Sequence, residues 1–484
     1  MEKRLTSALT LTAMLSGVVI SSISCGETQL PGDDQNATSE SASTEETTAD
    51  PLADDLPDKN YGDADFDLLV RTERLYYLQA DEENGDTLND AVYKRNLTVE
   101  QRFDVKLNYH DVASDKSVFT KAVESSVMAG DEGYDVICPD YLWQLDVSGY
   151  FIDLNSLDYL DFDKPWWNAA WNEHATIGGK CYTSVGYLCL DLLRNTEVIY
   201  FNKKLIDEFK LDDPYALVNE NKWTLEKVSE MGQAVAGDVD GNGKMDENDR
   251  FGLYINDQAR NALYYSLGFS LISNKNGELA VNQISERDTS LNELILKLFG
   301  GGDEGNLYGS DITVDFTTTA AYKPFNQNNL LFTFFALTAV EAMRMTDVEF
   351  GIVPVPKYDT TQEWISSNYG CTLSAIPVNT PDAERSAIIL EALNAESYKQ
   401  VTPVYYESVL KGKLARDNDS EKMLDMIFGN LRFDFGFIHN QNLSGIPGGF
   451  TSGKNENIAS FYASQEENLK ARLGELQEKY DEMG

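Results

Sequence analysis

Two β-rich runs that follow each other directly, between Gly178 and Leu205, constrain the fold of this chain more than any other stretch. The first, GGKCYTSVGYLC, predicts a hairpin, and the second, TEVIYFN, predicts a further strand that leads into a Lys-rich helix start. Such a layout carries the chain from one packed body to another through extended backbone. Because 484 residues exceed one compact core, we expect two lobes of about 150 to 250 residues each.

The chain is strongly acidic, with 80 Asp and Glu against 39 Lys and Arg and a formal net charge of −41. No Lys/Arg cluster interrupts this excess, which excludes the basic surface of a nucleic-acid-binding protein. The same charge opposes tight contact with an anionic membrane, except through a covalent anchor. It is typical of a soluble, self-repelling protein on a cell exterior.

The N-terminus has the pattern of a bacterial lipoprotein signal. Lys3 and Arg4 form a short positive region, and residues 5–20 form an apolar stretch that is short for a membrane span. Small residues then lead to Cys25, which we expect to be lipidated as the first residue of the mature protein. Ser22 departs from the Leu that usually stands there, so an ordinary secretory signal is the alternative.

An acidic segment, residues 26–62, follows the signal of residues 1–25 and contains almost nothing apolar. Such a segment buries too little apolar area to offset the entropy of ordering, so we expect a disordered tether. A lipidated cysteine, a tether and a folded body are the layout of a receptor held on the extracellular face of the cell membrane.

The folded body begins with a strand at residues 65–70, a helix at 88–103 and a second strand at 105–109, which predicts a parallel βαβ unit. A buried strand at 134–140 comes later. Ligands of open α/β sheets bind beyond the carboxyl ends of the strands. We therefore expect first-lobe ligand contacts from Tyr76, Tyr77, Asp140, Tyr141 and Trp143. Residues 330–344, LLFTFFALTAVEAMR, predict a helix.

The segment KPWWNAAWNE holds three of the six tryptophans of the chain. Ligand pockets combine aromatic walls with a few polar groups, and indole faces stack on the apolar faces of sugar rings. Trp166 and Trp167 are thus candidate ligand contacts, preferred over Trp171. The alternative is that this tryptophan pair is plain core packing.

The segment DVDGNGKMDEND has the ligand spacing of an EF-hand-type Ca²⁺ loop. The predicted ligands are Asp238, Asp240, Asn242, Lys244 (through its carbonyl), Asp246 and Asp249, with Gly243 at the sharp turn. An Asp at the last ligand position reaches less far than the usual Glu. We expect a structural Ca²⁺ that ties the loop between a helix and the strand FGLYI; an acidic turn without metal is the alternative.

Several segments together resemble the family 1 extracellular solute-binding proteins, the maltose-binding-protein-like receptors of ABC importers. The resemblance rests on Gly179, Lys180 and Tyr182, followed by the strand-and-helix start at 198–203, and on the motif FGIVPVPK at 350–357. Scattered similar segments in the same order extend it over residues 63–484.

The resemblance implies an α/β fold of the two-lobed periplasmic-binding-protein type II, with strand hinges near 188–193 and 369–375. It divides the chain into a first lobe, 63–190 plus 371–430, and a second lobe, 191–370 plus 431–484. It also places Tyr187 near the ligand cleft, where many relatives have Asp, and second-lobe contacts by location at Tyr322, Phe334, Phe335, Phe433 and Asp434.

The function that this resemblance implies is capture of a carbohydrate, in the first place an oligosaccharide, by a non-enzymatic monomer that delivers it to the permease of an ABC transporter. No HExxH, GxSxG or GxxxxGK[ST] motif is present. A secreted glycoside hydrolase with two carboxylates stays open, because so many acids always offer pairs. A calcium-dependent adhesion module, and a peptide as the ligand, are further alternatives. Cys181 and Cys189 fit either one disulfide or two buried thiols.

Overall fold

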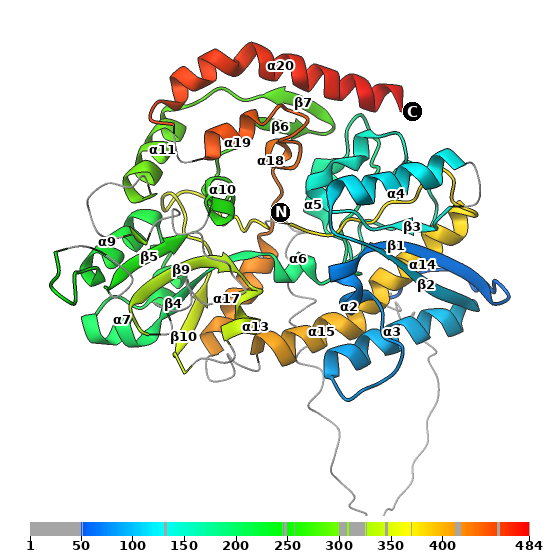
Figure 1. Cartoon of the computed structure of the whole chain (residues 1–484), viewed down its shortest axis with the longest axis horizontal. Helices are drawn as coiled ribbons and strands as arrows, with labels where there is room; N and C mark the ends of the chain where they lie inside the picture. The colour runs from blue at the N-terminus through cyan, green and yellow to red at the C-terminus, as the bar shows by residue number, and fades with distance from the viewer. Residues whose placement is uncertain are drawn as a thin grey trace, which may run out of the picture.

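The protein is divided into two α/β lobes that are joined at several points (Figure 1). The computed structural model describes residues 50, 52–129, 133–243, 245, 249–255, 257–299, 307–308, 325, 327–343, 347–368, 370–411, 418–452 and 455–483. The predicted signal at residues 1–25, with Cys25, lies outside the described residues, as do Tyr322, Lys244 and Asp246. Within the described part of the chain, no helix is long and apolar enough to cross a membrane.

The first lobe is built on a three-stranded parallel sheet with the order β2-β1-β3. Its strands and its crossover helix are β1 (Ala64–Arg71), β2 (Val105–Val112), β3 (Val136–Ile137) and α3 (Thr87–Phe103). β1 pairs with β2 along its whole length, from Ala64 opposite Val105 to Arg71 opposite Val112. Since parallel neighbours need a crossover, α3 runs between them, and the Asp86 carboxylate caps its first turn. The predicted βαβ unit is confirmed.

The remaining elements of the first lobe are η1 (Thr72–Arg74), α2 (Leu75–Leu78), α4 (Lys116–Ala129), η2 (Tyr141–Trp143), η3 (Leu145–Val147), η4 (Leu154–Ser156), α5 (Ala169–Ala175) and α14 (Ala383–Glu396).

One helix of this lobe, α14, is buried on all sides. The pattern of α14 predicts an amphipathic helix, yet every residue from Ser386 to Ala395 is buried. α3 packs against α14, and the side chain of Glu391 bonds to the Trp166–Trp167 segment.

The end of the predicted tether is ordered, contrary to expectation. Leu52, Leu56 and Tyr61 pack against the core of the first lobe. Arg102 makes two hydrogen bonds to the carboxylate of Asp54, which fixes the segment to α3. A few apolar side chains and this ion pair give residues 52–62 enough contact area to be held on the first lobe. The acidic composition of the segment does not indicate these contacts.

The second lobe carries a five-stranded mixed sheet with the order β10-β4-β9-β5-β8. Its strands are β4 (Glu197–Asn202), β5 (Phe251–Ile255), β8 (Leu307–Tyr308), β9 (Leu330–Ala336) and β10 (Phe350–Val353), and a separate hairpin is formed by β6 (Ile272–Lys275) and β7 (Glu278–Val281). β4 is antiparallel to both β9 and β10, whereas β5 is parallel to β8 and β9. The helices before and between these strands are α7 (Lys203–Phe209), α8 (Pro214–Asn219), α9 (Leu225–Val235), α10 (Asp257–Ser266), α11 (Glu286–Phe299) and α13 (Ala339–Met343).

The expected helix at residues 330–344 is wrong over its first half. LLFTFFA forms β9, the middle strand of the sheet, and only α13 is helical. A short, continuous apolar run fits a buried strand and a buried helix equally well by periodicity. The sheet decides between them, because β4 and β5 pair with β9 on its two edges.

The expected hairpin at 178–189 is also wrong. The backbone of this segment pairs with two distant segments: Ser184 bridges Ser374, and Gly186 bridges Trp167. Only a tight turn from Ile177 to Lys180 folds back on itself. The crossing that follows passes through a short helix, α6 (Asp191–Arg194), before β4 begins.

The chain crosses back between the lobes twice more. Residues 366–368 and 370–377 bridge partners from both lobes, among them Thr196, Asp140 and Ser184. The last crossing is a continuous run of helix and π-helix after α14: η5 (Ser397–Val401), α15 (Thr402–Tyr405) and η6 (Tyr406–Lys411). The next helix, α17 (Asn418–Gly429), packs against β10 and α8, so its contacts are with the second lobe although the sequence-based boundary at residue 430 places it in the first.

The C-terminal segment covers one side of both lobes. It contains α18 (Phe435–Ile438), α19 (Ile446–Thr451) and α20 (Ile458–Glu482). The run FYASQEENLKARLGELQEKYDE predicts a long closing helix, which α20 confirms. Figure 1 shows α20 lying across the top of the molecule, with its C-terminal end above the first lobe. One face of α20 is buried through Tyr462, Leu469, Leu473, Leu476 and Tyr480.

Candidate ligand-binding site between the lobes

Aromatic side chains from both lobes meet in a cluster that we call the interlobe seam. It consists of Tyr141, Trp171, Tyr265, Phe433 and Phe437. Trp171 lies edge-on to Phe433, with ring centroids 5.1 Å apart, and 6.2 Å from Tyr141. Phe437 lies 6.0 Å from Tyr141 and 5.1 Å from Tyr265. The rings of the two lobes are therefore in direct contact, edge-on or tilted to one another.

Local structure fixes the first-lobe side of the seam. Tyr141 begins η2 directly after the short strand β3, and the carboxylate of Asp140 caps that turn. Trp171 lies in the first turn of α5, where its backbone N–H is capped by Asn168. Its indole N–H donates to the carbonyl of Thr183 at 3.1 Å, so the ring orientation is set by a buried hydrogen bond.

On the second-lobe side, the residues lie near the ends of two helices. Tyr265 is close to the end of α10, and Phe433 and Phe437 flank the start of α18. The carboxylate of Asp434 caps α18 by accepting the backbone N–H of Phe437 at 2.9 Å. Burial raises the pKa of Asp434 to about 6, although hydrogen bonds from Ser270 and α18 oppose this rise.

A second carboxyl, that of Glu197, lies at the start of β4 in the crossing. It is only 4 % exposed, and its Oε2 has no hydrogen-bond partner among the described residues. Burial alone raises the pKa of Glu197 to about 8. The pKa of Tyr141 is raised far above its usual value, first by burial and also by charges on nearby groups including Glu197, so the two residues are within electrostatic range. A buried acid that has no counter-ion among the described residues is able to bond a polar group of a ligand.

An ion-pair network flanks the seam on the hinge side. The guanidinium of Arg71 contacts the carboxylates of Asp140 at 2.6 Å and Asp191 at 3.2 Å, and Arg74 contacts Asp191 at 2.6 Å. Arg194 makes a two-pronged pair with Glu341 of the second lobe. This network connects β1, α6 and α13, and it holds the two lobes at fixed positions beside the hinge.

The predicted ligand contacts from the first lobe fall into three environments. Tyr141 is in the seam. Asp140 is engaged on both oxygens, by Arg71 and by the backbone N–H of Leu142, so a ligand would have to compete for it. Tyr77 stacks under the guanidinium of Arg194 at 4.5 Å, Trp143 lies 5.7 Å from that of Arg71, and Tyr76 is 52 % exposed beside Tyr77.

Trp166 and Trp167 lie in the core of the first lobe. Their indole N–H groups donate to the two carboxylate oxygens of Glu391, at 2.7 and 2.8 Å. Burial raises the pKa of Glu391 to about 8 against the opposing effect of these two bonds. With both rings at most 4 % exposed, the core-packing alternative describes this pair in the structure.

Among the other candidates, Phe433 belongs to the seam, and Asp434 follows it in the chain as the cap of α18. Phe334 and Phe335 lie in β9, where Phe334 is buried opposite Ile199 in the sheet. Tyr187 packs edge-on against Tyr398 at 5.0 Å. Cys181 and Cys189 are both free, buried thiols.

Three residues of the site were not predicted: Tyr265, Phe437 and Glu197. A signal existed for Glu197, because it is the one acid in β4, a strand whose residues are all buried. Tyr265 and Phe437 carry no local signal, since their positions depend on how α10 and α18 pack against the first lobe.

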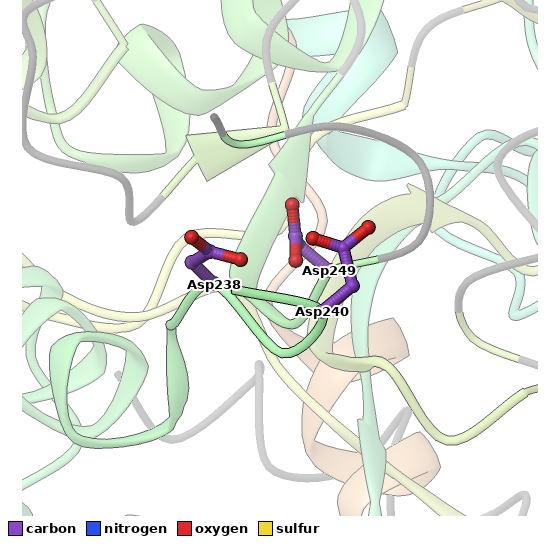
Figure 2. Close-up of side chains that lie close together, drawn as sticks. All are labelled: Asp238, Asp240 and Asp249. Atoms are coloured by element: carbon purple, nitrogen blue, oxygen red, sulfur yellow. The ribbon is translucent and has the colours of Figure 1, made fainter. Parts of the chain in front are cut away.

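A separate acidic site lies in the loop between α9 and β5. The carboxylates of Asp238, Asp240 and Asp249 offer oxygens that lie within 4.8 Å of one another (Figure 2). Asp238 accepts the backbone N–H groups of Gly241 and Gly243 at 2.7 Å, and Gly243 has the left-handed φ of 79° that the motif requires. This oxygen donor set suits a hard divalent cation such as Ca²⁺.

The two-lobed α/β fold is similar to that of several solved structures. Solved structures show this fold in the cyclic α-maltosyl-1,6-maltose-binding protein of Arthrobacter globiformis, at 16 % identity and a TM-score of 0.58, over 85 % of this chain and 99 % of that one. A sugar transporter protein of Rhizobium etli in an open conformation matches at 13 % identity and a TM-score of 0.56, over 84 % of this chain and 99 % of that one.

A third match of the same fold is the galacto-N-biose-/lacto-N-biose I-binding protein of a Bifidobacterium longum ABC transporter, in complex with lacto-N-biose. It has 13 % identity and a TM-score of 0.54, over 86 % of this chain and 99 % of that one. No model of a protein family and no curated protein matches the chain. The predicted α/β two-lobed fold is therefore confirmed.

Proposed function

We propose that this protein is a receptor that captures a carbohydrate, in the first place an oligosaccharide, between its two lobes. The observation that carries the proposal is the interlobe seam, in which rings from both lobes contact each other near the buried carboxyl of Glu197 and the partly buried carboxyl of Asp434. Aromatic faces stack on the apolar faces of sugar rings, while carboxyls bond the hydroxyls. Separation of the lobes about the crossings would let a sugar enter between these rings.

The names of the matched structures support the same ligand class, because they describe binding of cyclic maltosyl-maltose, maltotetraose and lacto-N-biose. We infer that the captured sugar is delivered unaltered to the permease of an ABC transporter. Lipidation at Cys25 would hold the receptor, as a monomer, on the extracellular face of the cell membrane. A glycoside hydrolase is the competing function, since Glu197 and Asp434 are each carboxyls with raised pKa values.

Replacing Phe433 with leucine is expected to weaken sugar binding about tenfold, because leucine keeps the apolar volume but has no ring face to stack on a sugar. Titration calorimetry against maltotetraose, lacto-N-biose and a mixture of short peptides measures this. The matched control is Phe162→Leu, which removes a ring that packs on Trp167 away from the seam. Binding of peptides alone would reject a carbohydrate ligand, and release of shortened sugar would favour the hydrolase.

We further propose that the α9–β5 loop binds one structural Ca²⁺. Asp240→Asn is expected to abolish a rise in melting temperature of a few degrees that millimolar Ca²⁺ produces in the wild type, because it removes one exposed ligand charge. Asp158→Asn, at another exposed acid, is the control. Equal Ca²⁺ responses in the wild type and in Asp240→Asn would contradict the site.

A further inference from the structure

The lobes are bridged on a second side, remote from the hinge network. The tip of the β6–β7 hairpin, from the second lobe, contacts the segment that follows α5 in the first lobe. Asn274 donates from its side-chain amide to the carbonyls of His174 and Thr176, both at 2.9 Å. The backbone N–H of Gly178 donates to the carbonyl of Gly277 at 3.3 Å.

The C-terminal end of α20 reaches the first lobe beside this tip. The hydroxyl of Tyr480 bonds to the carboxylate of Asp146 in η3, and the side chain of Lys180 donates to the carbonyl of Tyr480 at 3.2 Å. The Tyr480 ring also lies 5.7 Å from that of Tyr182. Asp146 faces a second group of the other lobe, since Nε2 of the buried His439 lies 3.6 Å from it.

The rest of α20 is fixed to the second lobe. α20 packs against α11, α19 and β7. Gln283, directly after the hairpin, donates to the hydroxyl of Tyr462 at 2.9 Å and to the carboxylate of Glu466 at 3.0 Å. The hairpin and α20 are thus one unit, which we call the strap, anchored on the second lobe and bonded to the first.

The strap and the hinge network lie on opposite sides of the interlobe seam. α5 carries Trp171 in its first turn, and its C-terminal end accepts the hydrogen bonds from Asn274. α18 carries Phe437 and packs against β6. Figure 1 shows the same order in space, with α6 at the centre, α5 and α18 above it, the hairpin next and α20 outermost.

We infer that the strap is a closure device for the ligand site: its bonds to the first lobe hold the lobes together and set the rate at which a ligand leaves. This inference rests on the proposed site between the lobes. The hinge contacts stay in place when the lobes swing apart about the crossings, whereas the strap contacts on the far side have to break. Their number and strength therefore determine the balance between the closed and the open form.

The test compares two double variants of the full chain. Asn274→Ala with Tyr480→Phe removes three hydrogen bonds between the lobes. The control, Ser273→Ala with Tyr264→Phe, removes hydroxyl hydrogen bonds within the hairpin and within the second lobe, away from the contacts between the lobes. We expect the first variant to release maltotetraose or lacto-N-biose about ten times faster than the control. Its unliganded form should also have a larger radius of gyration in small-angle scattering.

A third variant introduces a steric clash between the lobes instead of removing hydrogen bonds. Gly277 has a φ of 88°, and a Cβ at this position would lie 2.9 Å from the backbone nitrogen of Gly178. Gly277→Ala should therefore push the hairpin tip off the first lobe and open the molecule in the same scattering experiment.

The outcomes separate this inference from the proposed function. If both the double variant and Gly277→Ala scatter and release sugar like the control, the strap does not govern closure and the inference is overturned. If the wild type binds neither sugar, the proposed function fails, and the scattering comparison alone still decides whether the strap holds the lobes together.

Discussion

Replacing Glu197 with glutamine is expected to remove a pH-dependent loss of stability of about 4 kcal/mol. The folded chain holds the proton of this carboxyl up to about pH 8, because burial disfavours the ionised form, whereas the unfolded chain loses it near 4.5. The folded state thus binds more protons between these values, so this contribution makes the wild type less stable as the pH rises from 4.5 to 8. A neutral amide makes no such contribution.

Urea unfolding at pH 5, 7 and 9 measures this effect. Glu197→Gln should match the wild type within about 1 kcal/mol at pH 5 and exceed it at pH 9, by an amount that grows across the interval. Glu391 keeps its own titration near pH 8 in both proteins, so only the difference between them is diagnostic. Glu73→Gln, on the exposed surface of η1, is the control. A constant difference at all three pH values would show that Glu197 is ionised in the folded state.

Replacing Arg71 with methionine is expected to lower the free energy of unfolding by about 3 to 5 kcal/mol. The side chains of Arg71 and Asp191 are 4 % and 1 % exposed, and Arg71 also pairs with Asp140. Without the guanidinium, the carboxylates of Asp140 and Asp191 would lose part of the positive charge that offsets their own. The cost of removing one partner therefore far exceeds the net value of the pair itself.

The matched control is Arg102→Met, which breaks an ion pair with Asp54 where the arginine side chain is 36 % exposed and solvent screens the charges. Its expected cost is below about 1 kcal/mol. Adding Asp191→Asn to Arg71→Met should recover part of the lost stability, since it removes one of the carboxylate charges that Arg71 no longer balances. Equal costs for the two arginine variants would mean that water reaches the hinge network in the folded protein.

Much of the architecture followed from local patterns. The βαβ unit of the first lobe, the long closing helix and the Gly243 turn were predicted correctly, because each depends on periodicity, capping or glycine at neighbouring positions. The two-lobed fold was predicted from similar segments in the same order as in a known family. The sequence also singled out Tyr141 and Phe433, which the structure brings to the seam, and Asp434, which caps α18.

Contacts between segments far apart in the chain decided the features that the sequence did not predict correctly. β9 is a strand because β4 and β5 pair with it, and the segment after Gly178 is no hairpin because residues 167 and 374 take its backbone bonds. Trp166 and Trp167 turned inward since Glu391, more than 220 residues later, accepts both indole N–H groups. A sequence determines which side chains are able to stack, pair or cap; which partner each one meets is set by the free energy of the whole packed chain.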